Sequence, residues 1–162
     1  MNKQESIDHF WDIFVVDALI GNKDRHLGNW GFIKRNHLLE FAPVYDCGSS
    51  LSSMLTEEEQ CFLLKNLNEL KNVSYNIVSV YQFHGKRVFY YELFQNPVED
   101  LKQAILRIVP KIDEHKIKDI IYLTEGLSDC QKEFYFKSIM IRKEMILDSA
   151  YQKIIKEKNT KK

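Results

Sequence analysis

Residues 21–29 read Gly-Asn-Lys-Asp-Arg-His-Leu-Gly-Asn, and this polar stretch lies between two apolar segments. In residues 7–20 the apolar side chains recur every three or four positions, which predicts a helix with one buried face that ends at Gly21. Two apolar runs follow, at 30–33 and 38–41, and the polar residues between them predict a β-hairpin. This order of elements indicates one compact corner that is formed by the polar loop and the end of the hairpin.

Three oxygen-bearing side chains mark this corner. Asp24 and Asn29 are five residues apart (29 − 24 = 5), and Asp46 follows Asn29 by seventeen residues (46 − 29 = 17). Phosphoryl transfer needs a carboxylate that orients the attacking hydroxyl, an oxygen ligand for magnesium, and a second carboxylate between metal and phosphates. Asn, Asp and Gly also dominate ordinary turns, for local hydrogen-bonding reasons. The addition of Asp46, with Gly48 behind it, favours a phosphoryl-transfer site over turn chemistry.

The same spacing occurs in protein kinases, where a catalytic Asp precedes a metal-binding Asn by five residues and a hairpin leads to the Asp of a DFG motif. More specifically, residues 22–31 (NKDRHLGNWG) and 41–51 (FAPVYDCGSSL) resemble HipA-like serine/threonine protein kinases, whose core reads N-x-D-x-H-x-x-N and then P-x-Y-D. The resemblance implies a mainly α fold with a small β-hairpin, a protein-kinase-like carboxyl lobe of the HipA type. It also implies ATP and Mg²⁺ as cofactors and a protein Ser/Thr hydroxyl as acceptor.

The resemblance assigns roles to four residues. Asp24 is the expected catalytic base, Asn29 and Asp46 are the expected magnesium ligands, and His26 is expected to face the phosphates, as a catalytic and cofactor-binding residue. The triplet 46–48 stands where kinases have DFG. Two further roles are hypotheses about the loop itself: Arg25 pairs with a carboxylate to fix it, and Asn22 caps or braces it. Gly28 departs from the family, since many relatives carry Lys there.

Only 23 residues precede Asp24, so we expect the amino lobe, with its glycine-rich loop and nucleotide-gripping lysine, to be absent. The chain is then incomplete alone, and a separate amino-lobe chain is an expected partner. By resemblance the setting is a bacterial toxin–antitoxin system, with a DNA-binding, HipB-like antitoxin as partner and a translation factor or synthetase as substrate. The alternative is a non-catalytic binding module or truncated remnant. A lipid-kinase-like enzyme is less favoured, because DRHxxN also occurs in phosphatidylinositol-kinase-like enzymes.

Bulk composition narrows the possibilities further. A chain of 162 residues, 44% of them hydrophobic, predicts a single domain over 1–162, with 156–162 as a frayed tail. Lys plus Arg equals Asp plus Glu, at 23 each, which speaks against a direct nucleic-acid or membrane partner. The chain start has no apolar signal core, and a cytoplasmic location is expected. Three widely spaced cysteines speak against a disulfide framework and a zinc site.

The rest of the chain is predicted to be mostly helical. Further helices are expected at 57–70, 98–109, 113–123 and 128–155, the first with a Thr56/Glu59 capping box. Residues 72–96 are left between strand and helix, and their aromatic side chains are interpreted as core. The serines after the DFG-like triplet are candidates for phosphorylation, with a flexible polar loop favoured: Ser49, Ser50, Ser52 and Ser53. The other histidines, without ligand spacing, are interpreted as surface or packing residues: His9, His37, His84 and His115.

Overall fold

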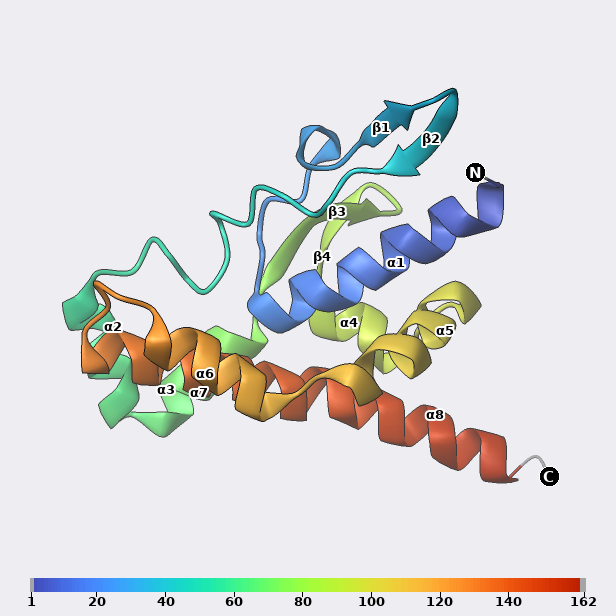
Figure 1. Ribbon diagram of the computed structural model, residues 1–162. Helices are drawn as coiled ribbons and strands as arrows, with labels where there is room; N and C mark the ends of the chain where they lie inside the picture. Colours follow the sequence, from blue (N-terminus) through green and yellow to red (C-terminus); the bar gives the residue numbers. More distant parts are fainter. Residues whose placement is uncertain (1, 161–162) are drawn as a thin grey trace.

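The structure is a computed structural model that describes residues 2–160 (Figure 1). It begins with helix α1 (Lys3–Ile20), which Asn2 caps: its side chain accepts from the Glu5 backbone, and the Glu5 carboxylate accepts from the Asn2 backbone. The helix ends where Gly21 adopts φ 68, in the left-handed region that favours glycine. The helix predicted over 7–20 is confirmed, and it starts four residues earlier (7 − 3 = 4).

Two short antiparallel hairpins interrupt an otherwise helical chain (Figure 1). After α1 the elements follow in this order: the 3₁₀ turn η1 (Leu27–Asn29), β1 (Phe32–Arg35), β2 (Leu38–Phe41), α2 (Glu57–Lys65), α3 (Leu67–Tyr75), β3 (Val78–Phe83), β4 (Lys86–Phe89), α4 (Tyr90–Gln95), α5 (Glu99–Ile108), η2 (Val109–Lys111), α6 (Glu114–Leu123), α7 (Asp129–Arg142), the π-helical turn η3 (Lys143–Asp148) and α8 (Ser149–Thr160).

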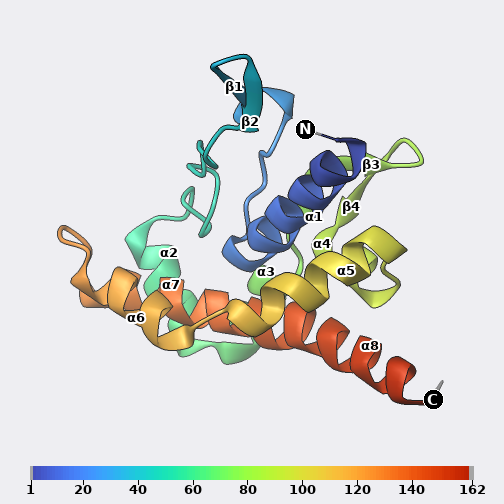
Figure 2. The ribbon, with the colours of Figure 1, turned by 45° about the vertical axis from the view of Figure 1, so that its right-hand side comes forward.

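The core lies between α1 and the carboxyl-terminal helices. Figures 1 and 2 both show α7 and α8 forming one long helical run, with α5 and α1 stacked on it and the β1–β2 hairpin projecting from the opposite side. Buried apolar side chains of α1, α4, α5 and the carboxyl-terminal helical run form one cluster, to which the β1–β2 hairpin contributes no residue; the cluster includes Phe14, Ala18, Tyr90, Phe94, Leu101, Ile105, Leu147 and Ile154. No helix within residues 2–160 is long and apolar enough to cross a membrane.

Several predicted elements are refined by the structure. The helix predicted over 57–70 is divided into α2 and α3 at Asn66, whose side chain caps α3 by accepting from the Glu69 backbone. Residues 72–96, left open by the sequence, end α3 and then form a second hairpin followed directly by α4. Helix α8 continues to Thr160, so the residues predicted to fray from 156 are helical as far as residue 160; residues 161–162 lie outside the described residues.

The absence of a disulfide, expected from the cysteine spacing, is also wrong. Cys61 of α2 and Cys130 of α7 form a disulfide across a sequence separation of 69 residues, with their Cα atoms 5.8 Å apart. The two helices pack side by side, and this neighbourhood cannot be read from spacing along the chain. Cys47 is the one free cysteine within the described residues.

Breaking the disulfide is expected to lower the free energy of unfolding by about 2–4 kcal/mol, because the link restricts the unfolded chain over a long loop. Urea denaturation with and without a thiol reductant measures the change. The matched control is the double variant Cys61→Ser/Cys130→Ser, which should unfold at the midpoint of the reduced chain in both conditions. An unchanged midpoint for the reduced wild type would contradict the stabilising role.

Candidate active site

The polar loop at 21–29 is fixed at its start by contacts from distant parts of the chain. The Tyr90 hydroxyl of α4 donates to the backbone carbonyl of Asn22 at 2.7 Å. The Asn22 side chain donates to Asp17 Oδ1 of α1 at 3.0 Å and accepts from the Asp24 backbone N–H at 3.1 Å. Asn22 and Asp17 are buried, so their polar groups have no access to water and these hydrogen bonds take its place. The hypothesis that Asn22 braces the loop therefore agrees with the structure.

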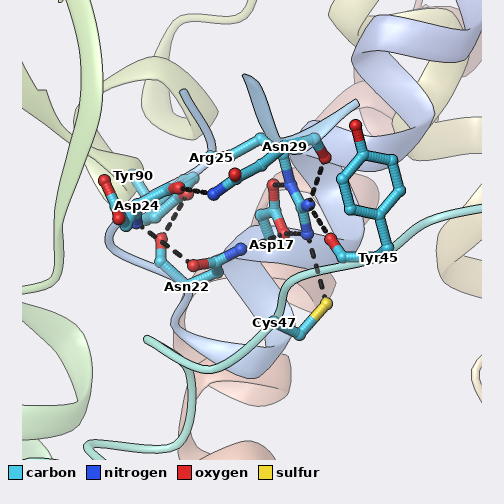
Figure 3. Close-up of polar contacts among 8 residues, drawn as sticks. All are labelled: Asp17, Asn22, Asp24, Arg25, Asn29, Tyr45, Cys47 and Tyr90. Carbon is cyan, nitrogen blue, oxygen red and sulfur yellow. Dashed lines mark hydrogen bonds and ion pairs between the residues drawn. The ribbon is translucent and has the colours of Figure 1, made fainter. Parts of the chain in front are cut away.

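Arg25 is the centre of the network (Figure 3). Its guanidinium, almost fully buried, donates to both oxygens of Asp17, at 2.9 and 3.0 Å. It also donates to the backbone carbonyls of Asn29, at 2.8 Å, and Tyr45, and its Nη2 lies 3.2 Å from Cys47 Sγ. One side chain thus joins α1, the polar loop and the segment after the first hairpin. Arg25 does pair with a carboxylate, as hypothesised.

Electrostatics keeps this centre charged. The hydrogen bonds from Arg25 to Asp17, and then to Cys47, raise the guanidinium pKa above its usual value against the opposing effect of burial. Tyr90 lies in the same buried environment, where desolvation first and the nearby Asp17 charge second raise the pKa of its phenol. The phenol donates its hydrogen bond to the Asn22 carbonyl of the loop within this environment.

Asp24 and Asn29 are joined directly. The Asn29 side-chain amide donates to the backbone carbonyl of Asp24 at 2.7 Å, and this bond closes the loop on itself. Asn29 is buried, whereas Asp24 is exposed and its carboxylate has no hydrogen bond or ion pair within residues 2–160. The Asp24 carboxylate is therefore free to meet a ligand, while its backbone is held in place.

Asp46 sits on a segment that is held against this loop from both sides. The residue before it, Tyr45, accepts from Arg25 through its carbonyl and donates from its hydroxyl to the Gly28 carbonyl at 3.0 Å. The residue after it, Cys47, contacts the Arg25 guanidinium. Asp46 itself has φ 53, a left-handed conformation that Asp tolerates better than most residues, and its side chain is exposed.

The oxygen atoms left over suit a magnesium ion. Since the Asn29 amide nitrogen is used by Asp24, the Asn29 amide oxygen remains as an acceptor, and the Asp46 carboxylate has no partner among residues 2–160. The described residues hold no group of three or more His, Cys, Asp or Glu that would bind a metal by themselves. Magnesium in phosphoryl-transfer sites takes few protein ligands and fills its shell with phosphate oxygens and water, so these residues fit the ion.

His26 is accounted for partly by local structure. Its Nδ1 accepts from the Gly28 backbone N–H at 3.0 Å and caps the 3₁₀ turn η1. A Cβ atom on Gly28 would lie 3.0 Å from the His26 ring, so a larger residue at this position would have to shift the ring. The residue is exposed, and its other ring nitrogen, Nε2, has no hydrogen bond within residues 2–160. Whether His26 faces phosphates stays a prediction.

The serines after the DFG-like triplet form a folded turn within this site. Ser50 and Ser52 are buried, and the Ser53 hydroxyl donates to the Gly48 carbonyl at 2.7 Å. The Ser49 carbonyl accepts from the Lys23 backbone N–H at 3.4 Å, which ties the turn to the polar loop. The structure therefore replaces the flexible polar loop, favoured from the sequence, with an ordered segment.

Sequence reasoning missed three residues of the network: Asp17, Tyr90 and Arg142. Asp17 had a usable signal, since an acidic residue between Val16 and Ala18 interrupts the apolar face of α1. Arg142 donates from Nε to the Leu19 carbonyl at 2.7 Å, across 123 residues, and so caps the end of α1. Its other two guanidinium nitrogens have no partner among residues 2–160, and burial lowers its pKa to about 10.

Gly21→Ala is expected to lower the free energy of unfolding by about 1–3 kcal/mol, because two constraints coincide at this position. It has a positive φ of 68, and a Cβ atom would lie 3.1 Å from Cζ of the buried Arg142. The control is Gly85→Ala, at φ 76, where an added Cβ atom would have no neighbour within 4 Å. This control measures the cost of the positive φ alone. Chemical denaturation measures both, and an equal effect would show that the Arg142 contact is unimportant.

Comparison with known proteins agrees with this geometry. The family model described as the HipA-like C-terminal domain matches residues 1–120, and the chain belongs to this family.

The chain is 39% identical over 151 residues to the serine/threonine-protein kinase CtkA of Helicobacter pylori (strain J99), a match that covers 90% of this chain and 46% of CtkA. The crystal structure of a Helicobacter pylori proinflammatory kinase, CtkA, matches with a TM-score of 0.87 and 38% identity, over 93% of this chain and 54% of that one. The chain thus spans about half the length of these relatives. The predicted family and the mainly α, HipA-type kinase fold are confirmed, and a second hairpin is added to the predicted one.

Proposed function

We propose that the chain is the catalytic half of a serine/threonine protein kinase, which transfers the γ-phosphate of ATP to a Ser or Thr hydroxyl of a protein. The observation that carries the proposal is the Arg25 network, since it joins α1, the polar loop that bears Asp24 and Asn29, and the segment that bears Asp46. Preorganised carboxylates on a rigid loop are what phosphoryl transfer requires of a protein, because most of its catalysis is positioning and charge stabilisation.

Each residue has a definite task in this proposal. The Asp24 carboxylate, exposed and free of internal partners, orients the substrate hydroxyl and accepts its proton. Asn29 and Asp46 hold Mg²⁺ through their side-chain oxygens, and His26 orients the phosphates through Nε2. The bound ion supplies charge neutralisation at the phosphate oxygens. Arg25 touches no substrate; it positions Asn29 and the backbone on either side of Asp46.

The partners follow from the same proposal. ATP and a protein substrate are the ligands, and an amino lobe, from this polypeptide or a separate chain, completes the nucleotide site. Exposed apolar side chains beside the loop and on the first hairpin suit such a lobe: Leu27, Phe32, Leu38 and Leu39. A HipB-like antitoxin and a toxin–antitoxin setting belong to the proposal by family. A cytoplasmic location stays a prediction, and the Cys61–Cys130 disulfide does not favour a reducing compartment.

The proposal is tested by label transfer. The chain, fused to or mixed with an amino-terminal lobe of a HipA-like kinase, is incubated with γ-labelled ATP, Mg²⁺ and a mixture of proteins and phosphoinositide vesicles. We expect label on protein serine or threonine, and none when EDTA removes the metal. Label on lipid alone would replace the proposal with a lipid kinase, and no label in any acceptor would favour a binding module.

A further inference from the structure

A groove on the surface of α2 and α3 is not used by the proposed chemistry. It has a volume of about 430 Å³ and is lined by Leu55, Glu58, Glu59, Phe62, Leu63 and Val73. Of these residues, Leu63 is buried, whereas the Phe62 side chain is 62% exposed. Met54, just before the groove, is 92% exposed. Large apolar side chains gathered at an exposed concave site are typical of a binding surface.

The rim of the groove is acidic. Glu58 and Glu59 line the groove, Glu57 directly precedes them in the first turn of α2, and no Lys or Arg lines the groove. Glu59 is occupied by the Thr56 capping box, but Glu57 and Glu58 form no ion pair in the described part of the chain. Acidic residues in a first helical turn also interact with the helix dipole. Beside an apolar groove, however, the two free carboxylates complement a positively charged partner.

The groove is linked to the active site by an ordered segment. Leu55 follows Asp46 by nine residues (55 − 46 = 9), so even a fully extended chain would place them within about 30 Å of one another. The actual path is shortened by turns, with bonds from the Ser50 N–H to the Cys47 carbonyl and from the Leu55 N–H to the Ser52 carbonyl. Figure 1 shows this segment leading from β2 to α2.

The backbone beside the groove is held at two points. Cys61, next to Phe62 on α2, is tied by its disulfide to Cys130 of α7. On the other side, the Leu51 N–H donates to the Ile20 carbonyl at 2.9 Å, so the turn before the groove is attached to the end of α1. A site held in this way loses little conformational freedom when a partner binds.

We propose that this groove docks a segment of the protein substrate in which Leu or Phe anchors are flanked by Lys or Arg. The inference rests on the proposed function, because it identifies the substrate class of the same site. The apolar anchors fill the space between Phe62, Leu63 and Val73, and the cationic residues pair with Glu57 and Glu58. The docked segment then lies on the side of α2 from which the chain leads back to Asp46.

Peptide binding tests the groove separately from catalysis. The probe is a fluorescent peptide with Leu and Phe anchors flanked by Arg, titrated with the chain without ATP or metal and followed by fluorescence anisotropy. Phe62→Ala is expected to raise the dissociation constant of the peptide by at least about tenfold. Glu57→Gln/Glu58→Gln is expected to raise it by about threefold and to make the affinity less dependent on salt.

The controls match the test variants in chemistry and exposure. Leu123→Ala removes an apolar side chain that is 80% exposed at the end of α6, and Glu125→Gln neutralises an exposed carboxylate; both should bind the probe like the wild type. Thermal unfolding confirms that each variant is folded. A peptide with Glu in place of Arg should bind at least about tenfold more weakly.

Four results would overturn the inference. The first is an acidic peptide that binds as tightly as the basic one. The second is an affinity that Phe62→Ala leaves unchanged. The third is self-association that Phe62→Ala abolishes, because the occupant is then a second copy. The fourth is displacement of the peptide by an added amino lobe. Failure of label transfer with intact peptide binding would instead remove the proposed function and leave a binding groove.

Discussion

Replacement of Arg25 with methionine is expected to lower the free energy of unfolding by about 3–5 kcal/mol, because it leaves the buried Asp17 carboxylate without its charge partner. The carbonyls of Asn29 and Tyr45 lose a donor as well. Urea denaturation measures the effect. The matched control is Arg107→Met, since Arg107 pairs with Asp12 near the surface, where the side chains are 34% and 29% exposed; that change should be worth at most about 1 kcal/mol.

A second variant separates the charge from the packing. Asp17→Leu combined with Arg25→Met removes both charges and should recover part of the stability lost by Arg25→Met alone, because no orphan charge remains. If Arg25→Met and Arg107→Met destabilised the chain equally, Arg25 would not be the centre of the site.

Replacement of Asp24 with asparagine is expected to slow phosphoryl transfer by about 10²–10⁴-fold, the usual contribution of a general base. The assay uses the chain with an amino lobe and follows single-turnover transfer to a protein serine or threonine. Because the Asp24 carboxylate has no partner within residues 2–160, stability should change by no more than about 0.5 kcal/mol.

Asp119→Asn is the control for this variant, since Asp119 is an exposed carboxylate on α6, away from the polar loop. It should leave the rate unchanged. If Asp24→Asn slowed transfer by less than about tenfold while remaining folded, another group would have to act as the base.

The parts of the fold that could be predicted from the sequence are those set by local pattern. The apolar period of α1, its end at Gly21 and the two apolar runs of the first hairpin all lie within short stretches of chain. The spacing of Asp24, Asn29 and Asp46 was likewise visible, because the hairpin that folds Asp46 back lies between them. The structure brings these segments together through Arg25.

The parts that could not be predicted depend on long-range contacts. Tyr90 reaches Asn22 across 68 residues, and Arg142 reaches Leu19 across 123. The Cys61–Cys130 pair depends on the packing of α2 against α7, which cysteine spacing does not reveal. The apolar helical pattern of 57–70 continues across the break between α2 and α3 at Asn66. The helix breaks there because the Asn66 side chain caps α3 and offers the backbone an alternative to continuing α2.

The most direct test of the central claim is calorimetric titration of ATP into the chain joined to an amino lobe, for the wild type and for Asp46→Asn, with and without Mg²⁺. We expect saturable binding by the wild type that depends on Mg²⁺. For Asp46→Asn we expect an affinity at least about tenfold weaker and no dependence on Mg²⁺. Binding by Asp46→Asn with the affinity and Mg²⁺ dependence of the wild type would contradict the claim.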